Sequence, residues 1–77
     1  MQYPRNDYDA LQVVTPSDTE TFKLSRILVG GAGNITVKLQ NGSTKLFTAM
    51  AANSEVPVLC IGVMATGTAA TDIARLF

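Results

Sequence analysis

Apolar and polar residues alternate along several short stretches of this chain, which is typical of β-strands with one buried face. The clearest case is 35–39, where every second residue is aliphatic. The stretch 22–29 alternates at its start and is continuously apolar toward its end, which predicts a strand that becomes buried on both faces. Between these stretches lie Gly30, Gly31 and Gly33. We expect this glycine corner to join the two strands by a tight turn.

The Asn-Gly pair at 41–42 predicts a hairpin, because type I′ turns need a positive φ at both central residues. A two-residue loop would place Lys38 opposite Lys45, which is an unfavourable pair of like charges. A three-residue loop would instead pair Val37 with Phe47. We predict the longer loop and this second register.

The remaining strands follow from apolar runs between turn signals. We expect a first strand at 10–14, a return strand at 44–50, a central strand at 56–65, a loop at 66–71 and a final strand at 72–77. Five or six short strands of this kind predict an all-β fold, a small antiparallel β-sandwich or barrel-like domain. We assign 1–15 to an extended N-terminal arm with the first short strand, and 16–77 to a single β-sandwich domain.

The size of the chain limits its stability. It has 77 residues, of which 47% are hydrophobic. A core of this size supplies only about 3–5 kcal/mol, so small domains commonly add a disulfide, a metal or a partner subunit. Cys60 is the single cysteine, which excludes an internal disulfide, and the absence of histidine removes the commonest zinc ligand. We therefore expect a homo-oligomer.

The first nine residues are polar and too poor in aliphatic side chains to form a core element. Two interpretations stay open. This segment is either a frayed terminus or an arm that docks on a neighbouring subunit. In the second case, Tyr3 and Tyr8 would supply the aromatic contacts that protein interfaces favour.

Charge and hydropathy argue against nucleic acid and membrane partners. Six basic and six acidic residues give a net charge of zero, and the basic ones are spread singly along the chain. Binding to nucleic-acid phosphates needs clustered cations. The longest apolar run, 56–65, is about half of the roughly 20 residues that a spanning helix needs. The N-terminus lacks the apolar segment of a secretory signal, so we expect synthesis in a cytoplasm.

No stretch of the sequence predicts a catalytic, cofactor or metal site. Phosphate loops need Lys and Ser or Thr after the last glycine, and dinucleotide fingerprints need a helix there, but a strand is predicted after the glycine corner. Cys60 lies in an apolar run, where a thiol is unreactive, and no histidine is present as a general base. The acidic pairs Asp7–Asp9 and Asp18–Glu20 lack the spaced ligands of a calcium site and are interpreted as solvated turn residues.

Four stretches of the sequence carry a family resemblance: Pro-Ser-Asp at 16–18, RILVGGAGNITV at 26–37, Val-Pro-Val at 56–58 and ATGTAATDI at 65–73. In this order and spacing they resemble the small spike-base proteins, or head decoration proteins, of tailed bacteriophages and gene transfer agents. The resemblance covers 16–77. The chain departs from the family pattern at 51–57, which lacks a glycine, and in its longer N-terminal arm.

The resemblance implies a non-enzymatic β-sandwich protein that assembles as a symmetric oligomer on the particle, where it carries a fibre or decorates the shell. We expect a capsid-associated head spike-base, decoration or cement subunit without a cofactor, located in the virion after synthesis in the host cytoplasm. Its expected partners are copies of itself and the major capsid protein or a fibre protein. A tail or baseplate component and a glycan-binding surface module are the alternatives. The candidate interface residues are Tyr3, Tyr8, Gly30, Gly31, Gly33, Thr66, Gly67 and Thr68.

Overall fold

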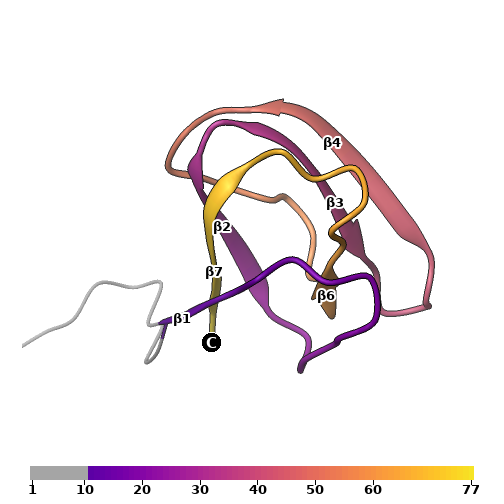
Figure 1. Ribbon diagram of the computed structural model, residues 1–77. Coiled ribbons are helices and arrows are strands. Elements are labelled where there is room, and N and C mark those ends of the chain that lie inside the picture. Colours follow the sequence, from indigo (N-terminus) through magenta and orange to yellow (C-terminus); the bar gives the residue numbers. More distant parts are fainter. Residues whose placement is uncertain (1–10) are drawn as a thin grey trace, which may run out of the picture.

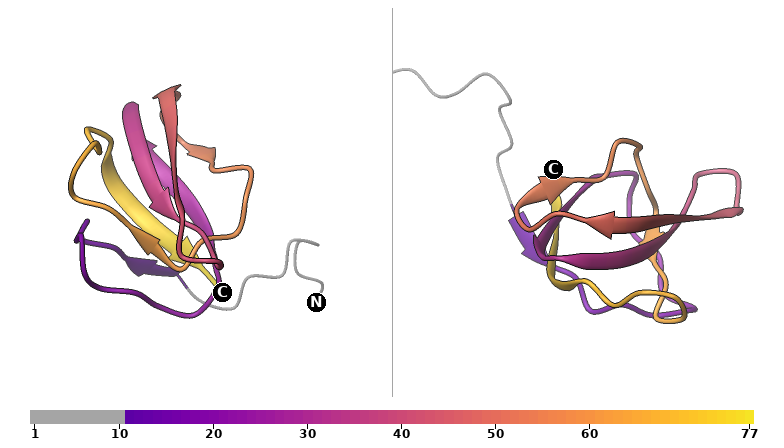
Figure 2. Two further views of the ribbon diagram at one scale, coloured as in Figure 1. Left: turned by 90° about the vertical axis from the view of Figure 1, so that its right-hand side faces the viewer. Right: turned by 90° about the horizontal axis from the view of Figure 1, so that it is seen from above.

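Two antiparallel sheets form the fold of residues 11–77, the part of the chain that the computed structural model describes. One sheet has the strand order β1-β7-β2-β5 and the other the order β4-β3-β6. The strands are β1 (Leu11–Val13), β2 (Arg26–Gly31), β3 (Gly33–Lys38), β4 (Thr44–Met50), β5 (Ser54–Glu55), β6 (Gly62–Val63) and β7 (Thr71–Leu76). Figure 1 shows β1 and β4 at opposite sides of the molecule, and Figure 2 gives two further views of the sheets.

The predicted fold class is confirmed. Residues 11–77 contain strands and no helix, and the sheets of four and three strands are both antiparallel. The structure has seven strands where five or six were predicted, because β5 and β6 contain only two residues each. The core lies between the sheets, and its residues with less than 2% exposure are Ile27, Val29, Ile35, Val37, Val56 and Cys60.

The glycine corner carries the chain from one sheet to the other. Strand β2 ends at Gly31 and β3 begins at Gly33, and the two strands belong to different sheets. Gly33 has a φ of 149°, a conformation that residues with a side chain rarely adopt. The predicted tight corner is confirmed, and it is the point at which the two layers of the sandwich are joined.

The β3–β4 hairpin has the predicted loop length but a different register. Its loop is 40–42, and the glycine at the end of this loop has a φ of 92°. Val37 pairs with Lys45, and Phe47 pairs with Ile35. The predicted Val37–Phe47 pair is therefore wrong by two residues, because the loop begins one residue earlier than the Asn-Gly pair suggests.

The apolar run 56–65 is not a central strand, and this prediction is wrong. Only Gly62–Val63 is a strand, at the margin of the three-stranded sheet. The amide of Val56 donates to the carbonyl of Ile27 in β2, whereas the amide of Ile61 donates to the carbonyl of Lys38 in β3. The run crosses from one sheet to the other, and it buries Val56, Cys60 and Val63 in the core but leaves Val58 and Leu59 exposed.

Candidate interaction surface

The margins of the two sheets differ in how well they are protected against pairing with another chain. Strands β1 and β5 are the outer strands of one sheet, and β4 and β6 are those of the other. Short strands, inward charges and bulges protect such edges. β5 and β6 have two residues each, so β1 and β4 are the two edges that need closer inspection.

Strand β4 carries two protective features. Lys45 pairs with Val37, whose side chain is fully buried, so Lys45 leaves the strand on the core side of the sheet. Its Nζ atom lies 5.9 Å from the centre of the Phe47 ring. The register also shifts near the end of the strand, where Ala49 has a φ of 53°. An inward cation and a bulge together disfavour the addition of another strand to β4.

Strand β1 is also short, with three residues, but it carries neither an inward charge nor a bulge within the described residues. The amide of Val14 donates to the carbonyl of Ile73 in β7 at 2.8 Å. Because hydrogen-bonded pairs alternate in an antiparallel ladder, the backbone groups of Leu11 and Val13 point away from β7, toward the free edge. Their side chains are 58% and 74% exposed. This edge combines free backbone groups with exposed aliphatic side chains.

The exposed side chains of β1 continue into an apolar surface on the outside of the four-stranded sheet. Val13 pairs with Ala74, which pairs with Leu28, and Leu11 pairs with Leu76. Paired residues share a face. We call this surface the outer apolar face; its residues are Leu11, Val13, Leu28, Ala74 and Leu76. Leu11 and Val13 are exposed, Leu28 and Leu76 are half-buried, and Ala74 is buried. Arg26 pairs with Leu76 and Glu55 pairs with Leu28, so the ion pair between them, with a distance of 3.1 Å, lies on the same face.

The outer apolar face shows that one prediction about the stretch 22–29 is wrong. The stretch 22–29 was predicted to end as a strand buried on both faces. Ile27 and Val29 are fully buried toward the core, but Leu28, on the other face, is only half-buried. The strand also begins at Arg26, and Ser25 rather than Leu24 is buried. The continuous apolar pattern therefore includes a second face that residues 11–77 leave open.

The glycines of the corner lie against the start of β7. A Cβ atom on Gly30 would lie 2.7 Å from the carbonyl oxygen of Asp72, and one on Gly33 would lie 2.9 Å from the amide nitrogen of Ala70. A Cβ atom on Gly31 would collide with the side-chain hydroxyl of Thr71 in β7. The corner therefore allows two stretches of backbone to approach each other within one chain, which is what glycine permits.

The predicted loop 66–71, which we call the small-residue loop because it contains only Thr, Gly and Ala, lies on β3 next to the same corner. Thr68 Oγ1 accepts a hydrogen bond of 3.0 Å from the amide of Thr36, and Thr36 Oγ1 donates to the carbonyl of Gly67 at 3.1 Å. The amides of the two residues that follow Thr68 both donate to the carbonyl of Asn34, at 2.8 and 2.9 Å. The structure thus brings together two of the four segments that carry the resemblance, 26–37 and 65–73.

These contacts within one subunit explain why both the corner, 30–33, and the small-residue loop consist of glycine and other small residues. A role of Gly30, Gly31, Gly33 and the 66–68 loop in contacts between subunits stays a prediction. Tyr3 and Tyr8 lie outside the described residues.

Asp18 connects the segment 14–25, which joins β1 to β2, with the small-residue loop. Its Oδ1 atom accepts a hydrogen bond of 2.9 Å from the amide of Thr66, and its Oδ2 atom accepts one of 2.7 Å from the hydroxyl of the same residue. These two bonds lower the pKa of Asp18 below its ordinary value, with the amide as the larger cause. No pattern in the sequence indicates this contact; the interpretation of Asp18 as a solvated turn residue does not include it.

Acid is expected to weaken the Asp18 contact in a defined pH range. Because the pKa is lower in the folded than in the unfolded chain, the ionised carboxylate stabilises the fold above the unfolded value of 3.8. This contribution is lost as the pH falls through the lowered native pKa. We expect Asp18→Asn to reduce the urea midpoint at neutral pH and to equal wild type at about pH 2. Thr66→Val should remove part of the same acid dependence, and a pH-independent deficit of Asp18→Asn would contradict the assignment.

Cys60 is a core residue. It is fully buried, and burial raises the pKa of its thiol to about 11. Its backbone pairs with Ser25 in both directions, at 2.9 Å each. We expect the native thiol to react with a disulfide reagent at mildly alkaline pH far more slowly than the thiol of the urea-unfolded chain, because the thiolate is the reactive form. Equal rates in the two states would contradict this placement.

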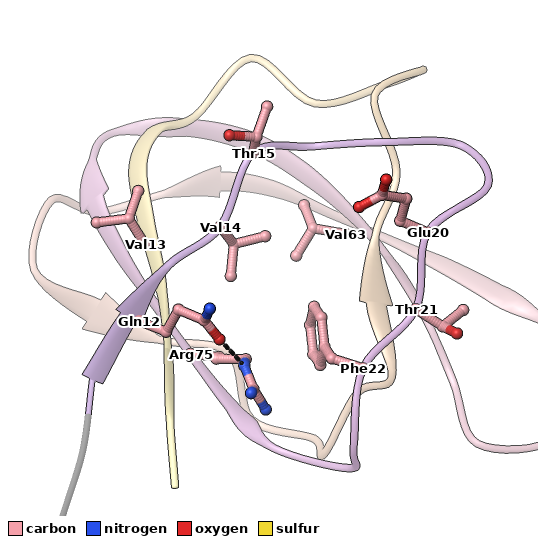
Figure 3. Close-up of a pocket in the computed structure, with 9 residues that line it drawn as sticks. All are labelled: Gln12, Val13, Val14, Thr15, Glu20, Thr21, Phe22, Val63 and Arg75. Atoms are coloured by element: carbon pink, nitrogen blue, oxygen red, sulfur yellow. Dashed lines mark hydrogen bonds between the residues drawn. The ribbon is translucent and has the colours of Figure 1, made fainter.

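A groove of about 340 Å³ lies beside β1 (Figure 3). It is bounded by β1, by the segment that follows it and by β6 and β7. Figure 3 shows Val14, Val63 and Phe22 around its middle, with Glu20 and Arg75 at different ends. The sequence did not predict this groove, because its lining comes from residues far apart in the chain.

Within residues 11–77, no helix is long and apolar enough to cross a bilayer. The same part of the chain contains no cluster of three or more His, Cys, Asp or Glu residues that could hold a metal ion.

The fold and its surfaces define a small domain of two antiparallel sheets that leaves one apolar face and one strand edge open. Among solved structures, the capsid of a native GTA (gene transfer agent) particle, computed with C5 symmetry, contains a similar chain. The two chains superimpose with a TM-score of 0.78 and are 25% identical, over 91% of this chain and 83% of the other. No protein-family model and no curated protein matches this sequence.

Proposed function

We propose that this chain is a structural protein of a phage or phage-like virion, located on the head as a spike-base, decoration or cement subunit. The similarity to a chain of a gene transfer agent capsid carries this proposal, because it covers most of both chains and includes 25% sequence identity. The four stretches that resemble spike-base proteins point in the same direction. Its partners would be copies of itself and the major capsid protein or a fibre protein.

The open surfaces support a function that depends on assembly. The outer apolar face exposes aliphatic side chains on the strands of an otherwise well-packed sheet, and β1 offers free backbone groups beside it. Contiguous exposed apolar surface of this kind marks a protein–protein contact. In the proposed mechanism, docking on the particle buries this face and adds the stability that a core of this size lacks.

Particle binding by charged variants tests the proposal. Leu11→Glu with Val13→Glu places two charges on the outer apolar face, and Thr44→Glu with Thr48→Glu places two charges on exposed positions of β4 as a matched control. We expect the first variant to lose co-sedimentation with particles while its urea midpoint stays close to that of the control. Undiminished binding of the first variant would contradict docking through this face.

Imaging of labelled particles tests whether the subunit lies on the head or on the tail of the particle. A label at the C-terminus should appear on the head. A label on the tail would instead support the tail or baseplate alternative.

A further inference from the structure

The groove beside β1 has opposite charges at its two ends and apolar side chains between them. Arg75 lies at one end and Glu20 at the other, and Val14, Phe22 and Val63 line the middle (Figure 3). A volume of about 340 Å³ is at the lower limit of sites that hold a ligand of drug size. The groove therefore suits a short peptide segment with one aromatic ring and a charge on each side of it.

Arg75 is held in place as an anion-binding group. Its Nε atom donates to Oε1 of Gln12 at 2.8 Å, and its Nη1 atom donates to Oγ of Ser25 at 3.1 Å. Its guanidinium lies 4.1 Å from the centre of the Phe77 ring and 5.2 Å from that of Phe22. None of the carboxylates within 11–77 forms an ion pair with it. A guanidinium positioned in this way binds a carboxylate more strongly than a mobile one does, because less side-chain entropy is lost.

The segment before β1 carries the complementary groups in the matching order. Arg5, Tyr8 and Asp9 occur in this order, with Asn6 and Asp7 between the first two. We propose that the groove of one copy binds residues 1–10 of a second copy, with Asp9 at Arg75, Tyr8 over the apolar middle and Arg5 toward Glu20. This inference rests on the self-assembly in the proposed function, and it names the surface that receives the arm.

The geometry favours a second copy over the same chain. Gln12 forms part of the groove wall at the Arg75 end, and only two residues separate it from Asp9. To reach its own groove, the chain would have to reverse direction within those two residues, although Leu11 is held in β1 by its pairing with β7. Ten extended residues span up to about 33 Å, which is enough to reach a neighbouring subunit.

Photo-crosslinking of the full chain tests whether residues 1–10 bind in the groove and whether they belong to a second copy. A photoreactive amino acid replaces Thr21, an exposed residue of the groove, or Thr44, an exposed residue of β4 as the control. Copies labelled with heavy isotope and unlabelled copies are mixed before irradiation. We expect crosslinks from position 21 to residues 1–10 of the other isotopic form and none of these from position 44. Crosslinks confined to one isotopic form, or no crosslink from position 21 to this segment, would overturn the proposal.

Charge reversal tests the predicted contact between Arg5 and Glu20. Glu20→Lys and Arg5→Glu should each weaken self-association by about three- to tenfold, as measured by sedimentation, and the double variant should recover most of this loss. Additive losses would contradict the pairing. If the arm contact fails but wild-type chains still bind particles through the outer apolar face, this inference is wrong and the proposed function stands.

Discussion

Replacing Gly33 with alanine is expected to leave most of the chain unfolded. The new Cβ atom would lie 2.9 Å from the amide nitrogen of Ala70 and 3.0 Å from the carbonyl carbon of Ala69, and both atoms belong to backbone that cannot move aside cheaply. The φ of 149° adds about 1–3 kcal/mol of strain. The total cost approaches the roughly 3–5 kcal/mol that a core of this size supplies. Urea or thermal unfolding followed by circular dichroism measures the loss.

Gly42→Ala is the matched control for this substitution. Gly42 also has a positive φ, of 92°, but a Cβ atom there would have no neighbour within 4 Å. The control therefore contains the backbone strain without the collision. A loss of stability in Gly33→Ala that is no larger than in Gly42→Ala would show that close packing at the corner is unimportant.

Replacing Ile35 with alanine is the second substitution with a large expected effect. Ile35 is fully buried in β3, at the centre of the core between the two sheets. Removing its side chain should cost about 2–5 kcal/mol through lost burial and the cavity left behind. We expect a variant that is largely unfolded in isolation. Calorimetry of the purified subunit measures this, and stability like that of wild type would contradict the placement of the core.

Leu46→Ala is the control for Ile35→Ala. Leu46 lies in the neighbouring strand β4, but its side chain is 46% exposed. Substitutions at exposed positions usually change stability by about 0.5 kcal/mol or less. The contrast between the two variants reports burial directly, because both remove an aliphatic side chain of the same size.

The sequence predicted those strands in which the pattern of apolar residues follows directly from burial of one face. The alternation at 35–39 identified the buried residues of β3, and the apolar residues of the stretch 44–50 identified β4 with its observed bounds. Hairpin register was wrong because it depends on which loop residue takes the positive φ, and the Asn-Gly pair allows more than one choice. The run 56–65 was misassigned because apolarity reports burial and not the direction of the chain.

The interaction surface was harder to predict from the sequence. Gln12 and Arg75, which meet at the groove, are 63 positions apart, and Asp18 and Thr66 are 48 apart. No short motif records such contacts. The exception is the apolar run that ends β2, whose Leu28 faces outward. Its pattern predicted burial on both faces, but Leu28 is only half-buried within residues 11–77.

The inward Lys45 has a consequence for how copies of this chain can grow into an assembly. If both β1 and β4 accepted strands, each copy could pair head to tail with the next, and such contacts produce open-ended filaments unless the ring closes. Because β4 is protected, β1 is the one unprotected edge strand among the described residues of each subunit. Pairing between the sheets of two copies would therefore end with a β1–β1 pair and would not extend into a filament.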